Sequence, residues 1–244
     1  MPGGARSSTV SAHPLIRSLG LAVSRIASLL ADRACRLCGA VLQSTPGPLC
    51  GWCVARLYPN TDRYAPVVLE NHSRVVVRSS FLHAGSAREL VIGLKFRGRR
   101  ELGRLAADLM TGAGTIPPDA AGCVIVPVPL CRTRLRQRGY NQAEEIGAAL
   151  ARAHGARMSR CLSKEDRPPQ TGLSAAMRRS NVRGAFGAGR EAVPGGVPIL
   201  LVDDVVTTGS TLSEAAAFLE AEGGDVAGAL TLTYRPEARG YIID

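Results

Sequence analysis

The chain has very little lysine and few aromatic residues. Of its 30 basic residues only Lys95 and Lys164 are lysines. Aromatic side chains make up 4% of the 244 residues, which leaves little surface on which nucleic-acid bases can stack. The net charge of +10 favours polyanionic partners, and arginine suits bidentate recognition of phosphate. A GC-rich genome produces the same arginine bias, so charge alone does not identify the partner.

The sequence also lacks a hydrophobic run long enough to span a membrane. Residues 15–30 are rich in aliphatic side chains, but Arg17 and Arg25 interrupt them, and a span needs about 20 apolar residues. No small-residue cleavage site follows an apolar core, so no secretion signal is predicted. We expect residues 1–33 to form a tail and an amphipathic helix that packs on the protein or lies on a membrane surface. The predicted location is the cytoplasm.

The chain has seven cysteines, and this odd number argues against the disulfide framework of a secreted protein. Four of them form two Cys-x₂-Cys pairs within residues 34–57, a small module of its own. Four thiolates at this spacing can close a tetrahedral shell around a metal ion. We predict a structural Zn²⁺ site, with rubredoxin-like iron as the alternative. The predicted ligands are Cys35, Cys38, Cys50 and Cys53.

Two roles for this cysteine module stay open. It can attach the N-terminal helix to the core, or it can help to bind single-stranded nucleic acid through charge and stacking. The second role would use side chains beside the cysteines, namely Arg33, Arg36, Trp52 and Arg56.

From residue 74 to the end, the pattern alternates between strands and helices. Such an order predicts an α/β domain with a parallel sheet flanked by helices. Two nearly unbroken apolar runs, 123–129 and 198–204, are typical of strands buried on both faces. The other predicted strands are 74–83 and 226–234, and the predicted helices are 86–96, 101–111, 141–154 and 211–222.

A long basic segment, residues 163–187, interrupts this alternation. A loop of that length in a compact domain is either a functional lid or disordered. Because it lies between two core elements, we favour a lid and call it the hood.

Residues 199–212 carry the clearest functional signal. A buried strand ends in Asp203 and Asp204, and a helix begins after Gly209, so these residues lie where open parallel sheets bind ligands. Successive N–H groups and hydroxyls at a helix N-terminus form a phosphate cradle, here without the lysine of a Walker loop. The predicted phosphate-binding residues are Val205, Val206, Thr207, Thr208, Gly209, Ser210 and Thr211.

The two aspartates beside this cradle are the predicted catalytic pair. Two carboxylates can accept hydrogen bonds from two adjacent hydroxyls. Phosphate and vicinal diol together describe a ribose 5-phosphate group. The alternative, that Asp203 and Asp204 cap the following helix, is disfavoured because they precede it by too many residues.

Four arginines at alternate positions lie on a predicted loop after the strand at 123–129. Guanidinium groups there would neutralise a departing diphosphate, although a solvated basic surface is the alternative. On an extended segment their alternate spacing would point them in different directions, so not all reach one ligand. The predicted pyrophosphate-binding residues are Arg132, Arg134 and Arg138, joined by Lys95 and Arg97.

Five features in order resemble the ComF family of competence-associated, phosphoribosyltransferase-like proteins. The likeness covers about residues 33–235. The features are the cysteine module, Leu94–Gly98, Val126–Pro129 with Arg138–Gln142, Gln170–Leu173 with Arg178–Asn181, and Asp203–Gly209.

This resemblance implies a type I phosphoribosyltransferase fold and a site for Mg²⁺ with 5-phosphoribosyl 1-pyrophosphate (PRPP). It places Asp203 and Asp204 on the ribose, Thr207–Thr211 on the 5-phosphate and Arg132–Arg138 near the pyrophosphate. The hood would fold over the site and offer Lys164, Arg167, Arg178 and Arg179 to the phosphates.

The implied function is phosphoribosyl transfer to an unidentified nucleophile, with a link to DNA uptake. The alternative is a non-catalytic protein of DNA uptake or processing that binds single-stranded DNA on the same scaffold.

One departure from the pattern of related enzymes is informative. Purine-salvage relatives can carry a proton-accepting aspartate where this chain has Thr207, which argues against a hypoxanthine- or guanine-type enzyme.

Overall fold

The computed structural model describes residues 34–42, 47–61, 64–65, 75–166 and 184–236. The chain divides into two compact units, residues 1–51 and 52–244. The helix predicted within residues 1–33 lies outside the described residues, as does most of the hood. No helix among those described is both long and apolar enough to cross a membrane.

The larger unit is built on a six-stranded sheet in which five neighbouring strands run parallel. The short first strand pairs antiparallel at one edge. The predicted parallel sheet is therefore confirmed. In spatial order the strands are β1 (Tyr64–Ala65), β2 (Val77–Leu82), β8 (Asp225–Tyr234), β7 (Pro198–Val206), β3 (Val124–Pro127) and β4 (Arg157–Met158).

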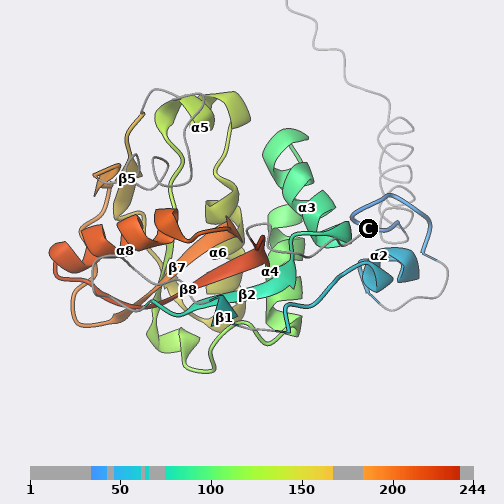
Figure 1. The fold of residues 1–244 in the computed structure, drawn as a ribbon, viewed down its shortest axis with the longest axis horizontal. Coiled ribbons are helices and arrows are strands. Elements are labelled where there is room, and N and C mark those ends of the chain that lie inside the picture. The colour runs from blue at the N-terminus through green and yellow to red at the C-terminus, as the bar shows by residue number, and fades with distance from the viewer. Residues whose placement is uncertain (1–33, 43–46, 62–63, 66–74, 167–183, 237–244) are drawn as a thin grey trace, which may run out of the picture. The chain divides into compact units, whose positions relative to one another are not determined.

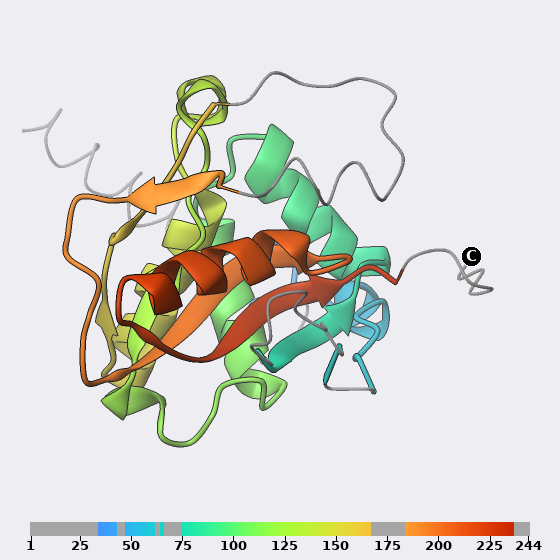
Figure 2. The ribbon, with the colours of Figure 1, turned by 60° about the vertical axis from the view of Figure 1, so that its left-hand side comes forward.

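Helices cover both faces of this sheet (Figure 1). α8 lies across one face, and α4 and α6 pack together behind the sheet, as the turned view in Figure 2 also shows. The helices are α2 (Gly51–Ala55), α3 (Gly85–Phe96), α4 (Leu102–Gly112), α5 (Arg132–Arg138), α6 (Gln142–His154) and α8 (Ser210–Ala221), with a 3₁₀ turn at Ala120–Gly122.

Alternate side chains of the central strand β7 pack against the helices on opposite faces of the sheet. Ile199 and Leu201 belong to the buried cluster that includes the apolar side of α8. Their neighbours Leu200 and Val202 are also buried, as expected because successive side chains of a strand point to opposite faces. The apolar part of β7 thus needs cover on both sides, which explains its nearly unbroken hydrophobic run.

The parallel arrangement brings the carboxyl ends of β2, β8, β7 and β3 to one edge of the sheet. β7 and β8 stay paired as far as Val206 and Tyr234, so the polar end of β7 lies at this edge. The elements that follow these strands, including α5 and α8, therefore begin near one another.

Several segments differ from the expectation, among them the two-residue strands β1 and β4, which were not predicted. The arginine-bearing segment, expected as a loop, is helix α5, because its residues are mostly good helix formers and Gly139, with φ of +77°, ends it in the left-handed region. At the base of the hood, β5 (Leu162–Lys164) pairs antiparallel with β6 (Phe186–Ala188). These two short strands were not predicted.

A glycine in α4 allows the close approach of α4 and α6. A Cβ added at Gly103 would lie 2.5 Å from the Cβ of Glu145 on α6. We expect Gly103→Ala to cost about 1–3 kcal/mol of stability through overpacking. A lower Tm in thermal denaturation would measure it.

Gly112→Ala, at the end of the same helix, is the matched control, because nothing lies within 4 Å of its added Cβ. It should leave Tm unchanged or raise it slightly, since alanine is the better helix former. Equal Tm values for both variants would contradict the close packing of α4 on α6.

Candidate active site

A buried ion pair marks the carboxyl end of β7. The side chain of Asp204 is 3% exposed, and its Oδ2 lies 2.6 Å from Nζ of Lys95 at the end of α3. Nε2 of Gln142 donates to the other oxygen over 3.5 Å. Because an unpaired buried carboxylate is costly, these two donors compensate for the burial of the Asp204 carboxylate.

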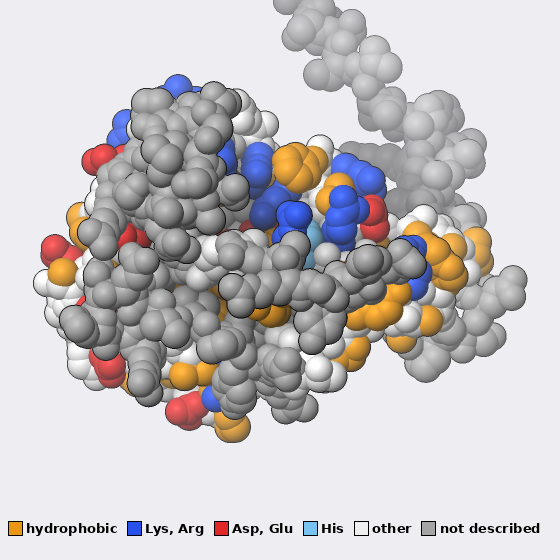
Figure 3. Space-filling model, viewed as in Figure 1, with side chains coloured by type: hydrophobic (Ala, Val, Ile, Leu, Met, Phe, Trp, Pro, Cys, Tyr) orange, Lys and Arg blue, Asp and Glu red, His pale blue; other side chains and the backbone are white. Residues whose placement is uncertain are grey.

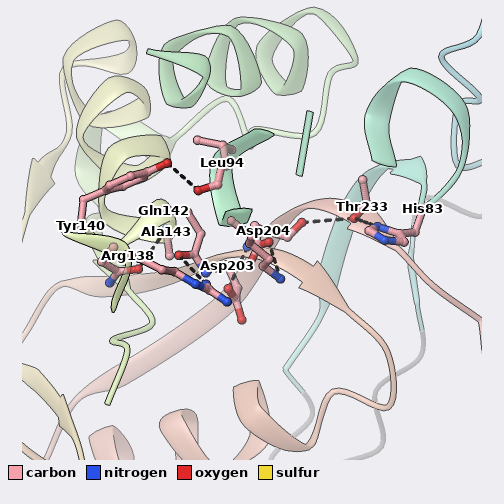
Figure 4. A network of polar contacts seen from close by, with 11 residues as sticks. His83, Leu94, Arg138, Tyr140, Gln142, Ala143, Asp203, Asp204 and Thr233 are labelled. Carbon is pink, nitrogen blue, oxygen red and sulfur yellow. Dashed lines mark hydrogen bonds and ion pairs between the residues drawn. The ribbon is translucent and has the colours of Figure 1, made fainter. Parts of the chain in front are cut away.

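The residues at the start of α6 hold these donors in position. Arg138 donates to Oε1 of Gln142 over 3.0 Å, which orients the amide nitrogen of Gln142 toward Asp204. The hydroxyl of buried Tyr140 donates to the carbonyl of Leu94, beside Lys95. Figure 4 shows Tyr140 reaching Leu94, and Gln142 beside the two aspartates. The sequence predicted no such positioning role for the segment Arg138–Gln142.

Asn141 connects the same segment to β3 and α6. Its side-chain oxygen accepts from the N–H of Ala143 and caps α6, while its amide donates to the carbonyl of Val128. The loop after β3 is thereby fixed against the helix that carries Gln142.

Asp203 has a different environment from its neighbour. Burial and then the nearby charge of Asp204 raise the pKa of Asp203 to about 8. Lys164 of β5 is close enough for the two charges to act on each other, while burial lowers the pKa of Lys164. Because the two carboxyls are neighbours, the charge of one disfavours ionisation of the other, and a cationic ligand would lower the pKa of Asp203.

The segment after β7 forms the expected helix-terminal loop. Gly209 adopts a φ of +79° and precedes α8, whose first N–H groups face the loop. The hydroxyls of Thr208 and Ser210 lie 3.1 Å apart. Thr207 and Thr208 are exposed, whereas Val205 and Val206 remain paired within β7. The arrangement offers backbone donors, hydroxyls and a helix N-terminus to an anion.

The residues predicted to bind pyrophosphate do not all lie in one place. Arg134 and Arg138 are four residues apart and share a face of this helix. Burial lowers the pKa of Arg138, against the charge of Asp204. Arg132 instead lines a cavity of about 430 Å³ beside Lys164 and Arg160. Outside α5, exposed Arg97 pairs with Glu89.

Figure 3 shows basic side chains gathered over α3 beside exposed hydrophobic surface. Phe96, at the end of α3, is 73% exposed, and the guanidinium of Arg138 lies over its ring at 5.5 Å. The hood residues Arg167, Arg178 and Arg179 lie outside the described residues.

His83 was not predicted as a site residue. It directly follows β2, and its Nδ1 lies 3.0 Å from the hydroxyl of Thr233 on β8. That hydroxyl donates to the backbone carbonyl of Asp204 over 3.3 Å. A sequence signal existed, because His83 ends a predicted strand and strand ends meet at the binding edge.

The four predicted metal-ligand cysteines lie together. All four Sγ atoms are within 4.8 Å of one another, and those of Cys38 and Cys50 are 3.7 Å apart. Sulfurs bound tetrahedrally at about 2.3 Å from Zn²⁺ would be about 3.8 Å apart, so the cluster fits such an ion. Burial raises the pKa of Cys35, but hydrogen bonds from Cys38, Cys50 and Leu37 outweigh it and lower the pKa to about 6.

Comparison with protein families agrees with this fold. The phosphoribosyl transferase domain family matches residues 89–242, more than half of the chain. The chain belongs to this family, and its architecture is the type I phosphoribosyltransferase fold. No protein with a curated description matches it.

Several solved structures are similar at low identity. Adenine phosphoribosyltransferase from Thermoanaerobacter pseudethanolicus is 15% identical over 72% of this chain and 93% of its own, with a TM-score of 0.35. The enzyme from Saccharomyces cerevisiae, complexed with an imino-altritol bisphosphate and adenine, is 18% identical over 59% and 72%, with a TM-score of 0.29. A phosphoribosyltransferase from Corynebacterium diphtheriae is 19% identical over 66% and 86%, with a TM-score of 0.28.

The raised pKa of Asp203 predicts that an uncharged side chain at this position makes the protein more stable, by an amount that depends on pH. Folding stabilises the protonated form, so wild type loses stability as pH rises from about 4, the ordinary value, toward 8. Asp203→Asn keeps the acceptor for the N–H of Asp204 and carries no charge. At pH 8 its Tm should exceed that of wild type, by about 2–4 °C for each kcal/mol by which ionisation of Asp203 destabilises the wild-type fold. The difference in Tm should shrink toward pH 4. A pH-independent difference would contradict the raised pKa.

Proposed function

We propose that the protein is a phosphoribosyltransferase of the ComF type that binds PRPP with Mg²⁺ and transfers the phosphoribosyl group to a nucleophile. The observation that carries this proposal is the position of the aspartate pair directly before a phosphate-binding helix terminus. A vicinal diol and a phosphate on one ribose match these two groups of donors and acceptors.

The carboxylates would bind the ribose rather than a metal. Asp204 is already paired with Lys95, and within the described residues the four cysteines are the only cluster of three or more potential metal ligands. Mg²⁺ would therefore enter the site as a complex with PRPP and not through protein carboxylates. When bound, it supplies positive charge that stabilises the departing diphosphate.

The protein's own residues would stabilise the transition state through fixed charges. Asp203 and Asp204 would accept hydrogen bonds from the two ribose hydroxyls, and the N–H groups of residues 207–211 would hold the 5-phosphate. Arg134, Arg138 and Lys164 would balance charge on the leaving diphosphate while positive charge develops at C1. The hood, whose base is β5 and β6, would exclude water from the reaction.

A second candidate is single-stranded DNA binding on the same scaffold, as in DNA uptake. The observation in its favour is a pair of exposed rings in contact with arginine. Trp52 is 62% exposed with the guanidinium of Arg56 at 4.2 Å, and Phe96 has Arg138 over it. Stacking together with charge is the usual mode of binding single strands.

Calorimetric titration with PRPP distinguishes the two candidates. Wild type should bind PRPP when Mg²⁺ is present, and Asp204→Asn should weaken binding at least tenfold, because charged hydrogen bonds are worth about 1.5–3 kcal/mol. Asp225→Asn is the matched control, since Asp225 is exposed at the opposite end of β8. The control should bind as wild type does.

If well-folded wild type binds no PRPP, the transferase proposal is wrong. Salt-sensitive binding of a single-stranded oligonucleotide in its place would identify the second candidate, because phosphate contacts weaken steeply with salt.

We also propose that the cysteine cluster holds structural Zn²⁺. Purified protein should carry about one zinc per chain by mass spectrometry, and Cys38→Ser should lose it together with stability. Cys131→Ser, at a half-buried cysteine outside the cluster, is the control and should retain the metal. Visible absorption from iron–thiolate bonds would identify iron instead, and metal-free folded protein would contradict both.

A further inference from the structure

We propose that His83 is the catalytic base that accepts a proton from the incoming nucleophile. The inference rests on the proposed phosphoribosyl transfer and adds the class of acceptor. The second substrate would be a nucleophile that carries a removable N–H or O–H proton rather than one that is already anionic. Nothing in the sequence reading assigned such a base.

The order of the strands places His83 on the nucleophile's side of the site. The diphosphate-binding arginines follow β3, which flanks β7 on one side, and β8 and β2 continue the sheet on the other. In displacement at C1 the nucleophile approaches opposite the leaving group, and therefore over the ends of β8 and β2. His83 is fixed there by its backbone N–H, which donates to the carbonyl of Tyr234 over 2.8 Å.

The spacing suits a bound ribose and an acceptor atom. Neighbouring strands lie about 4.8 Å apart, so the end of β2 is about 10 Å from the aspartates on β7. The side chain of His83 is half-buried, and it reaches back toward β7 through Thr233 (Figure 4). A ligand on Asp203 and Asp204 would thus have this imidazole beside its open side.

The hydrogen bonds define which ring nitrogen can act as base. Thr233 is fully buried, and its one hydroxyl proton is donated to the carbonyl of Asp204. Nδ1 of His83 must therefore be the donor to that hydroxyl, and Nε2 carries the lone pair. Within the described residues Nε2 makes no hydrogen bond, so it is available to a ligand.

The surrounding charges keep this ring neutral. Burial and the positive charges of Lys95, Arg235 and Arg88 lower the pKa of His83, and the charge of Asp204 opposes them. In the proposed complex the two aspartates are already bound to the ribose hydroxyls. At position 207 the phosphate loop offers a threonine rather than a carboxylate. His83 is thus the neutral base on this side of the site.

The step balances without a further reactant. The lone pair of the nucleophile forms a bond to C1, and the C1–O bond breaks with its electron pair leaving on the diphosphate. The proton of the nucleophile moves to Nε2 of His83, which becomes an imidazolium ion. Repulsion from Lys95 and Arg235 then favours return of that proton to solvent.

His83→Asn tests this role with the Thr233 contact preserved, because the asparagine amide can take the place of Nδ1–H. With water as the nucleophile, we expect release of pyrophosphate from Mg²⁺–PRPP to fall about 10²-fold or more in kcat. KM and the calorimetric affinity for PRPP should change less than threefold. In wild type, kcat should fall as pH drops through a pKa below 6.5, and this limb should be absent from the variant.

Nitrogen NMR of labelled histidine provides a test that needs no turnover. With four histidines in the chain, His83→Asn identifies the His83 signals. We expect the Nδ1–H tautomer, neutral at pH 7. The Nε2–H tautomer, or unchanged turnover and pH profile in His83→Asn, would overturn the inference while PRPP binding by wild type keeps the proposed function. Failure of wild type to bind PRPP would overturn both.

Discussion

The ion pair between Lys95 and Asp204 is the interaction on which the arrangement of the site depends. A carboxylate buried at the end of a central strand is tolerated only when charge and hydrogen bonds compensate its lost hydration. Lys95 supplies the charge from α3, and Gln142 supplies a hydrogen bond from α6. The need to satisfy Asp204 therefore couples two helices to β7, and it leaves the neighbouring Asp203 as the carboxyl that titrates near neutral pH.

From this pair outward, each strand end contributes a different part of the site. β7 leads into the phosphate loop, β3 leads through a fixed turn into the arginines of α5, and β8 and β2 bring Thr233 and His83. Parallel strands are what allow such unrelated segments to meet at one edge. In the proposed complex the arginines of α5 would face the diphosphate on one side of β7, and the imidazole of His83 would lie on the other.

The sequence predicted the four longer strands of the sheet but not the two-residue strands β1 and β4. The clearest predictions were β3 and β7, whose apolar runs need burial on both faces. It also predicted the aspartates and the glycine that precedes α8, since their residue types are dictated by backbone geometry and anion binding. It failed for α5, whose arginines were expected on a loop, and for the short strands β5 and β6. The contacts of Lys95, Tyr140, Gln142 and His83 join segments far apart in sequence, and no local pattern records them.

The most direct measurement is a crystal structure of the protein with Mg²⁺ and PRPP. The account predicts the 5-phosphate on the N–H groups of residues 207–211, the ribose hydroxyls on Asp203 and Asp204, and the diphosphate toward Arg134 and Arg138. It also predicts that the Lys95–Asp204 contact persists, because that pair orients the carboxylate. A diphosphate on the His83 side of β7, or a ribose that does not touch the aspartates, would contradict it.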